Sequence, residues 1–222
     1  MKPKSLFVCL ISILLISGSF VWLPEGSKTT SSFPDTCLRM KTNPTCLSQN
    51  KAKSTSSLQQ KEIDGLVFMR EEEKLAYDVY SHFSTMYSIP VFSNISRSEQ
   101  VHMDAVLNLL NSYSIPDPAS TKAKGEFRNT QLVELYHTLI ASGEKDLIAA
   151  LKAGALIEET DIADLKNHLN ETKNVEIIAT YTNLLEASYR HLRAFTKNLS
   201  FRQVTYAPQV LSPSEYKSIV EN

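Results

Sequence analysis

The chain has 222 residues, of which 42% are hydrophobic and 21% are charged, and its formal net charge is −1. This length allows one sizeable domain with extensions, and the composition is that of an ordinary globular protein. A net charge close to zero gives no reason to expect a nucleic-acid or anionic-membrane partner. Only 6 residues are Gly, which favours a mostly helical chain over a turn-rich β-protein.

Residues 1–23 have the layout of a secretory signal peptide. MKPK supplies positive charge, and a mostly apolar run from Leu6 to Leu23 follows, with small residues around Gly18 and Ser19 where cleavage is expected. An uncleaved membrane anchor is the alternative, because the run approaches the length that spans a bilayer. The sequence thus predicts a secreted or extracytoplasmic protein, or a membrane-anchored one if the segment is retained.

Residues 24–60 are rich in Ser, Thr, Lys and Pro and show little periodicity, which is typical of a flexible linker. Cys9 would leave with the signal segment, so Cys37 and Cys46 remain, and such a pair in an exported chain favours a disulfide. Glycosylation acceptor sequences begin at Asn94, Asn170 and Asn198. They matter only if the source glycosylates exported proteins.

From residue 61 onward apolar residues recur with the helical period, and the sequence predicts an all-α domain over 61–222. The four long helices are expected at about 61–87, 94–113, 144–169 and 174–199. SIPVF joins the first to the second and NETKN the third to the fourth, so each pair should form an antiparallel hairpin.

A long crossover, 114–143, separates the two hairpins and contains a short helix in NTQLVELYHTLIAS. Two helical hairpins with one long crossover are the connectivity of a ferritin-like four-helix bundle. The tail YAPQVLSPSEYKSIV is expected to be extended at first and then to form a short helix capped by Ser212.

Each of the four apolar stripes carries polar residues near its middle. They are Glu73 on the first helix, Glu99 and His102 on the second, Glu158 and Asp161 on the third, and Ser188 and His191 on the fourth. A buried carboxylate without a partner costs several kcal/mol, and cations shared by the four helices would remove this cost. Four carboxylates and two imidazoles are the set that a di-iron or di-manganese centre requires. The expected metal ligands are Glu73, Glu99, His102, Glu158, Asp161 and His191.

The histidines and Glu99 also have simpler interpretations. Ser96-Arg-Ser-Glu99 fits the capping box S-x-x-E, which would satisfy Glu99 without a metal ion. His102 alone could be an ordinary core histidine, and His191 could form a local polar cluster with Ser188. The other histidines have no carboxylate at a matching core-facing position. They are His82, His137 and His168.

The acidic runs leave two choices open. Glu73 belongs to REEEK, which could be a solvated cluster, and Glu72 falls on a second stripe. Glu158 competes with Glu159 in the same way, although position 158 shares a face with Leu151 and Leu165. The tyrosines near Glu73, which are Tyr77 and Tyr80, are expected to be packing residues, with hydrogen bonding to the centre as the alternative for a buried one.

Several segments, in order, closely resemble the ferritin-like family of unknown function 2202 (DUF2202). They are MREEEKLAYDVY, SEQVHMDAV, GALIEETDIADL, SYRHLRAF and YAPQVLSPSEY, and the resemblance covers about residues 66–220. More distantly, Glu73-x-x-Ala76-x-x-x-Tyr80 and Glu99-x-x-His102 look like the first two helices of rubrerythrins. The resemblance implies a ferritin-like bundle with a di-metal centre and brings no established activity.

One position departs from the ferritin-like pattern. Such di-iron proteins usually carry Glu-x-x-His on the last helix, whereas the matching residues here are Ser188-Tyr-Arg-His191. Asp161, one turn after Glu158, could supply the missing carboxylate. If it does not reach, the site would hold one metal ion, bind weakly or be vestigial.

Three functions are compatible with these residues. The first is a di-iron oxidoreductase, ferroxidase- or peroxidase-like, that acts on oxygen or peroxide or oxidises ferrous iron. Its electron donor would be external, because the chain has no CxxC pairs. The second is a non-catalytic secreted or surface bundle with a structural metal site, and the third is a metal-free bundle whose polar layer pairs internally.

Overall fold

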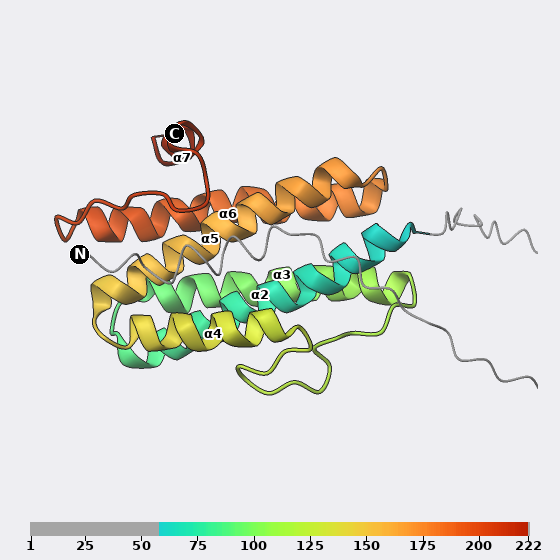
Figure 1. Cartoon of the computed structure of the whole chain (residues 1–222), viewed down its shortest axis with the longest axis horizontal. Helices are drawn as coiled ribbons and strands as arrows, with labels where there is room; N and C mark the ends of the chain where they lie inside the picture. The colour runs from blue at the N-terminus through green and yellow to red at the C-terminus, as the bar shows by residue number, and fades with distance from the viewer. Residues whose placement is uncertain (1–57, 222) are drawn as a thin grey trace, which may run out of the picture. The chain divides into compact units, whose positions relative to one another are not determined.

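The computed structural model describes residues 58–221, and within that range the chain forms helices and no strands. The signal segment, nearly all of the linker and the three cysteines lie outside the described residues. The helices, labelled as in Figure 1, are α2 (Gln60–Met86), α3 (Pro90–Ser112), α4 (Thr130–Gly143), α5 (Leu147–Glu171), α6 (Val175–Ser200) and α7 (Pro213–Val220).

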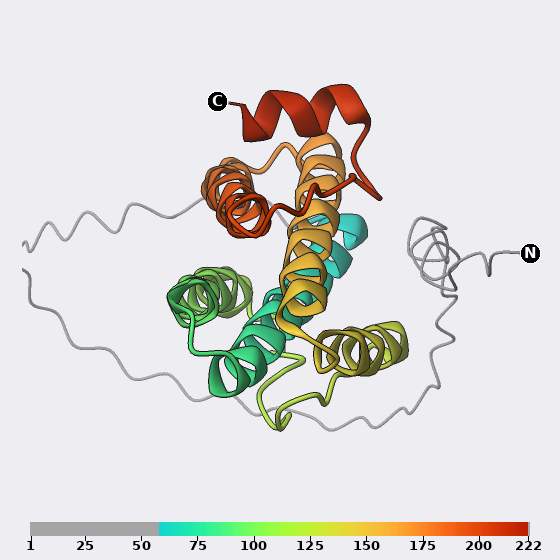
Figure 2. The same ribbon diagram turned by 90° about the vertical axis from the view of Figure 1, so that its left-hand side faces the viewer.

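The four long helices form two antiparallel hairpins, α2–α3 and α5–α6 (Figure 1). The connections are short, at 87–89 and 172–174. The hairpins meet where α2 packs on α5 and α3 packs on α6, and Figure 2 shows the same bundle turned by 90°. The predicted all-α bundle of two hairpins is confirmed.

The crossover and the tail add one short helix each. α4 packs against α2 and α5, and α7 packs against α6. Asn129 caps α4 by accepting a hydrogen bond from Gln131 N, and Ser212 caps α7 by accepting one from Glu215 N. Both short helices begin where side-chain capping satisfies free backbone N–H groups, as the sequence predicted for Ser212.

Two helices begin at residues other than those expected from the sequence. α5 begins at Leu147 rather than near 144, because Asp146 accepts a hydrogen bond from Ala149 N and acts as its N-cap. α3 begins at Pro90 rather than near 94, with the proline in the first turn, where its missing N–H costs nothing. Ser96 therefore lies inside α3 and donates to Ser93 O. The capping-box interpretation of Glu99 is wrong, and its carboxylate is not used by a helix end.

An aromatic cluster holds α2, α3 and α6 together. Tyr80 and Phe83 on α2, Phe92 on α3 and Phe195 on α6 are all fully buried. Adjacent ring centroids lie 5.1 to 5.7 Å apart, a spacing typical of favourable aromatic pairs. On α5, a Cβ at Gly154 would lie 2.5 Å from the Phe195 ring, so this glycine allows α5 to approach α6 closely.

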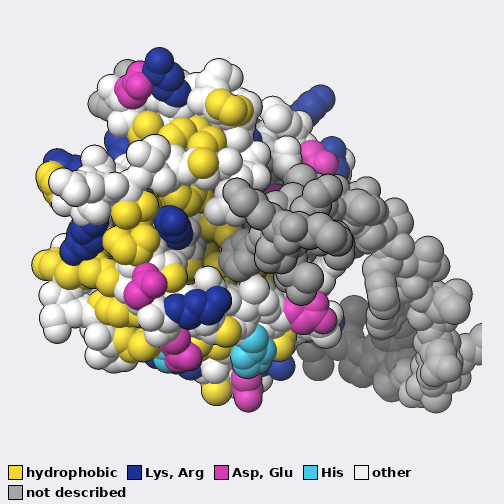
Figure 3. Space-filling view, turned by 60° about the vertical axis from the view of Figure 1, so that its left-hand side comes forward, with side chains coloured by type: hydrophobic (Ala, Val, Ile, Leu, Met, Phe, Trp, Pro, Cys, Tyr) yellow, Lys and Arg dark blue, Asp and Glu magenta, His cyan; other side chains and the backbone are white. Residues whose placement is uncertain are grey.

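The drawn face of the molecule mixes charges of both signs among hydrophobic side chains (Figure 3). No helix within 58–221 combines the length and the apolar character that crossing a membrane requires. On this face the acidic side chains are dispersed, whereas in the core several of them lie together.

Candidate metal centre

Four helices place five ionisable side chains in one buried layer. Glu73 comes from α2, Glu99 and His102 from α3, Glu158 from α5, and His191 from α6. All five are buried, and the three carboxylates are each 2% exposed. Such groups almost never lose their water without charge partners, so the partners within this layer decide its chemistry.

The first group of possible ligands is formed by Glu73, Glu99 and His102. His102 Nδ1 lies 3.1 Å from Glu73 Oε2 and 2.7 Å from Glu99 Oε2. Glu99 and His102 face the same way because they are three residues apart on one helix. One ligand atom from each of the three residues lies within 4.8 Å of the others.

The second group is formed by Glu99, Glu158 and His191. His191 Nδ1 lies 2.9 Å from Glu99 Oε1 and 3.5 Å from Glu158 Oε2, and here too one ligand atom from each residue lies within 4.8 Å of the others. Glu99 thus belongs to both groups, with Oε2 facing the first and Oε1 facing the second. Its carboxylate therefore lies between the two groups of possible metal ligands.

Several atoms of the layer lack a directed hydrogen bond although polar atoms surround them. Glu99 Oε1 and His191 Nδ1 are 2.9 Å apart, but neither is aligned for a hydrogen bond, and Glu73 Oε1 has no partner either. A buried polar atom without a partner costs about 1–3 kcal/mol. Atoms that converge without bonding one another suit a cation between them, so the residues fit a metal pair.

Asp161 lies beside the layer but in neither group. One carboxylate oxygen, Oδ2, accepts a short hydrogen bond from Ser188 Oγ on α6, and the other, Oδ1, has no partner. Ser188 also donates to Leu184 O in its own helix. The serine that replaces the expected glutamate therefore contacts the aspartate that could substitute for it.

Tyr80 contacts the layer directly, so hydrogen bonding to the centre, rather than simple packing, describes its role. Its hydroxyl donates to Glu158 Oε1 at 2.6 Å and lies 3.3 Å from Gly154 O. The stripe placed Tyr80 two turns from Glu73, but only the packing of α2 on α5 brings it to Glu158. The hydroxyl holds the Glu158 carboxylate in place.

The remaining acidic residues of the two runs have other partners. Glu71 accepts hydrogen bonds from the backbone N–H groups of Arg128 and Asn129 in the crossover. Glu159 accepts them from three consecutive N–H groups of the tail, those of Gln209, Val210 and Leu211. Both carboxylates are buried, so neither run is a solvated cluster. In the second run the structure brings Glu158, not Glu159, to the layer.

Glu72 faces a different neighbourhood from Glu73. It borders a small crevice among leucines of α4 and α5, including Leu132 and Leu139. Burial first, and then the carboxyls of Asp164 and Asp161, hold the pKa of Glu72 well above its usual range. Glu72 is therefore outside both three-residue groups, whereas Glu73 is in one of them.

The carboxyl groups of the layer differ in their pKa values. Burial raises the pKa of Glu73 to about 7, although His102 acts in the opposite direction. Burial would also raise the pKa of Glu99, but His191 and His102 lower it to about 2. For Glu158 and Asp161, burial raises the pKa and neighbouring carboxylates add to the effect. Only Glu99, between the two imidazoles, is strongly stabilised as an anion.

The two imidazoles are held by opposite charges. Burial alone would lower the pKa of His102, but Glu73 and Glu99 raise it to about 11. The pKa of His191 is raised to about 10 by Glu158 and Glu99 against the same effect of burial. Without metal, the layer is thus a network of imidazolium–carboxylate pairs. The other histidines, His82, His137 and His168, are in neither three-residue group.

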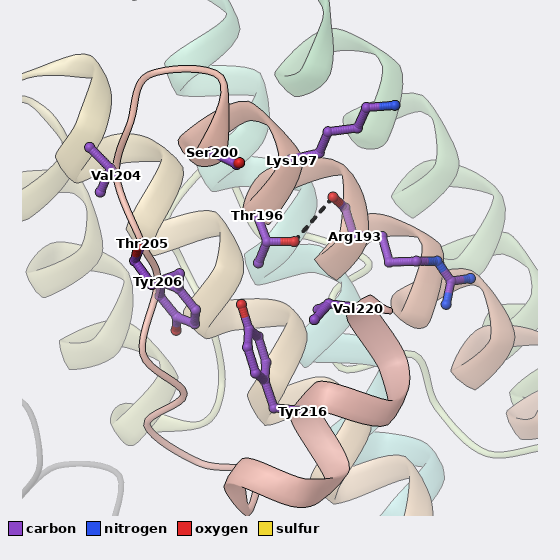
Figure 4. A pocket seen from close by; sticks show the side chains of 9 residues that line it. All are labelled: Arg193, Thr196, Lys197, Ser200, Val204, Thr205, Tyr206, Tyr216 and Val220. Carbon is purple, nitrogen blue, oxygen red and sulfur yellow. Dashed lines mark hydrogen bonds between the residues drawn. The ribbon is translucent and has the colours of Figure 1, made fainter. Parts of the chain in front are cut away.

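A surface cavity of about 480 Å³ lies away from this layer (Figure 4). It is bordered by α6, the tail and α7, and the tyrosine pair Tyr206 and Tyr216 lines it together with Thr196, whose hydroxyl donates to Arg193 O. None of the six expected ligands lines it. The buried layer, rather than this cavity, carries the arrangement suited to metal chemistry.

Comparisons with known proteins agree with the resemblance but name no activity. The family model described as "Uncharacterized protein domain (DUF2202)" matches residues 62–222. "Uncharacterized protein MJ0754" of Methanocaldococcus jannaschii is 44% identical over 165 residues, which are 74% of this chain and 89% of that protein. The crystal structure of hypothetical protein MJ0754 from Methanococcus jannaschii DSM 2661 aligns with a TM-score of 0.74 at 44% identity. The alignment covers 75% of this chain and 95% of that one.

Proposed function

This chain belongs to the DUF2202 family, and we propose that its domain binds two redox-active metal ions between the four long helices. The observation that carries the proposal is Glu99, whose two oxygens face two separate groups of ligands. Mixed carboxylate and imidazole donors suit iron and manganese better than the thiolate-preferring metals. Iron is the metal that we propose, with manganese as the alternative.

The ligand assignment follows the two groups. Glu73 and His102 would hold one ion, Glu158 and His191 the other, and Glu99 would bridge them. Asp161 would complete the set through Oδ1, the oxygen that Ser188 leaves unpartnered. This gives each ion one imidazole and at least two carboxylates, as in the carboxylate-bridged centres of four-helix bundles.

The proposed activity is the oxidation of ferrous iron, or the reduction of oxygen or peroxide with an external electron donor. Bound iron would supply the redox chemistry by cycling between its ferrous and ferric states. The chain contributes a site whose carboxylates are almost entirely shielded from water. Tyr80 contributes a hydroxyl that fixes Glu158, so the ligands are oriented before metal arrives.

Metal stoichiometry and oxygen uptake test this proposal. The full chain is purified without metal, titrated anaerobically with ferrous iron, analysed for bound iron and then exposed to oxygen in an oxygen electrode. We expect two iron ions per chain and oxygen consumption that Glu99→Gln abolishes. Glu186→Gln, at an exposed position of α6, is the matched control. Failure of the wild-type chain to bind iron or manganese would refute the proposal.

A non-catalytic metal protein is the second candidate, and Ser188 is the observation that favours it. The fourth long helix offers no carboxylate at the expected position, since Ser188 occupies it and contacts Asp161 and its own helix backbone instead. Such a site could bind metal for stability alone. Metal-dependent stabilisation against heat, together with no consumption of oxygen or peroxide, would support this candidate over the oxidoreductase.

A further inference from the structure

Ser98 contacts both imidazoles of the centre. It lies one turn before His102 on α3, outside the series of residues that face the core. Its Oγ is 3.4 Å from His102 Nε2 and 3.0 Å from His191 Nε2. The two rings are stacked, with their centroids 5.5 Å apart, and this single hydroxyl lies near Nε2 of both.

The two ring nitrogens of each histidine therefore face different partners. Nδ1 of His102 faces Glu73 and Glu99, and Nδ1 of His191 faces Glu99 and Glu158. A neutral imidazole that binds a metal through Nδ1 carries its proton on Nε2. In the proposed centre, both Nε2 atoms must then be hydrogen-bond donors.

A serine hydroxyl matches this requirement and excludes the case in which both Nε2 atoms lack a proton. Its oxygen can accept two hydrogen bonds, but its single proton can be donated only once. Two Nε2–H groups can therefore both bond Ser98, whereas two Nε2 lone pairs could not both be satisfied by it. The contact therefore fits Nδ1 binding by both rings and is incompatible with two unprotonated Nε2 atoms.

We propose that Ser98 is a positioning residue that fixes both histidines as Nδ1 ligands. This inference rests on the proposed function, because it presupposes a metal pair bound by the two groups. Outer partners of metal-binding histidines set the ring orientation and the tautomer. Here one residue does so for two rings from two helices, so a single substitution should weaken both ligands.

The relative distances predict an unequal effect. The contact of Ser98 with His191 is 0.4 Å shorter than the one with His102, and hydrogen bonds weaken as they lengthen. Loss of the hydroxyl should therefore loosen His191 more than His102. Ser96 offers a matched control, since it is a serine of the same helix whose Oγ bonds only Ser93 O among the described contacts.

The experiment compares the full-length wild type with Ser98→Ala, Ser98→Thr and Ser96→Ala, with Co²⁺ alone as the probe. Affinity and stoichiometry are measured by calorimetry. The paramagnetically shifted, exchangeable imidazole N–H signals are measured by proton NMR. We expect Ser98→Ala to bind Co²⁺ about 10–100-fold more weakly and both N–H signals to exchange faster with water, the His191 signal more so. Ser98→Thr, which keeps a hydroxyl, should resemble the wild type, as should Ser96→Ala.

The outcomes separate this inference from the proposed function. No Co²⁺ binding by the wild type would overturn both. Two-ion binding with unchanged affinity and unchanged signals in Ser98→Ala would overturn only the role of Ser98, and so would an effect on one ring alone. If Ser98→Ala does not fold, Ser98→Val replaces it, because valine has the shape of threonine without the hydroxyl. Equal binding by the Val and Thr variants would then overturn the inference.

Discussion

Glu158 and Glu159 are neighbours in sequence, both are buried in α5, and their surroundings differ completely. Glu159 accepts three backbone hydrogen bonds from the tail, whereas Glu158 faces His191 and Tyr80. The exposed fractions, 0% and 2%, do not distinguish them. Burial of a carboxylate is therefore no sign of a metal site by itself, and the kind of partner is what identifies one.

The acidic run of α2 repeats this contrast. Glu71 accepts hydrogen bonds from crossover backbone groups, and Glu73 faces His102. Backbone N–H groups can satisfy a carboxylate fully without any change in its charge. In the inner layer carboxylates lie near other carboxylates, as their raised pKa values reflect. The anchoring carboxylates, Glu71 and Glu159, are thus complete without metal, and the inner layer is not.

The largest expected effect is a difference in metal affinity between two variants, Glu158→Gln and Glu159→Gln. Glu158→Gln removes a proposed ligand and should weaken binding by more than the 10–100-fold typical of outer partners. Glu159→Gln should leave the affinity within about 3-fold of the wild type, because its carboxylate faces the tail. Calorimetric titration with Mn²⁺ measures both. Equal losses in the two variants would break the distinction.

In metal-free protein the order should be reversed: Glu159→Gln should lower the free energy of unfolding more than Glu158→Gln does. Glu159→Gln turns three charge-assisted hydrogen bonds into weaker neutral ones, and at about 1 kcal/mol for each the free energy of unfolding should fall by about 3 kcal/mol. Glu158→Gln removes a buried charge whose pKa is already raised, and His191 keeps Glu99 as its nearer carboxylate partner at 2.9 Å, so it should cost less than Glu159→Gln. Urea denaturation in the presence of a chelator tests this, and a larger loss for Glu158→Gln would contradict it.

The pH dependence of the inner layer should change sign when metal binds. In metal-free protein the pKa of His102 is raised to about 11 and that of His191 to about 10. Their stabilisation is therefore complete below pH 6.5 and is lost as pH rises toward 10–11. The pKa of Glu99 is lowered to about 2, so its stabilisation is present above pH 4.5 and is lost as pH falls toward 2.

Metal-free protein should consequently lose on the order of 2–3 kcal/mol of stability per pH unit between pH 7 and 9, because each of the two imidazoles contributes about 1.4 kcal/mol per pH unit. Metal binding needs deprotonated ligands and releases their protons, so the Mn²⁺-loaded protein should gain stability over the same range. Urea unfolding at three pH values, with and without Mn²⁺, provides the test. Parallel curves for the two forms would show that the histidines are not ligands.

The sequence predicted the four long helices, the two hairpins and the residues of the inner layer, because all of these follow from helical periodicity. It missed the start of α3 at Pro90, and with it the fact that Ser96 cannot cap a helix. It also missed the partners of Glu71 and Glu159, because those partners are loop backbone groups, which no side-chain pattern encodes. Ser98 carried one local signal, its four-residue spacing to His102, but its contact with His191 depends on how α3 packs on α6.

The smallest effect is expected for Glu72→Gln, which tests the border between the inner layer and its surroundings. Burial and the carboxyls of Asp164 and Asp161 hold the pKa of Glu72 well above its usual range. Its folded pKa exceeds its unfolded one, so this carboxyl destabilises the fold once pH rises above about 4.5. A neutral glutamine should relieve that penalty and stabilise metal-free protein at pH 8 by up to about 1 kcal/mol, with Mn²⁺ affinity within about 3-fold of the wild type. A large loss of Mn²⁺ affinity would instead make Glu72 a ligand and would place it, rather than Glu73 alone, on the α2 side of the centre.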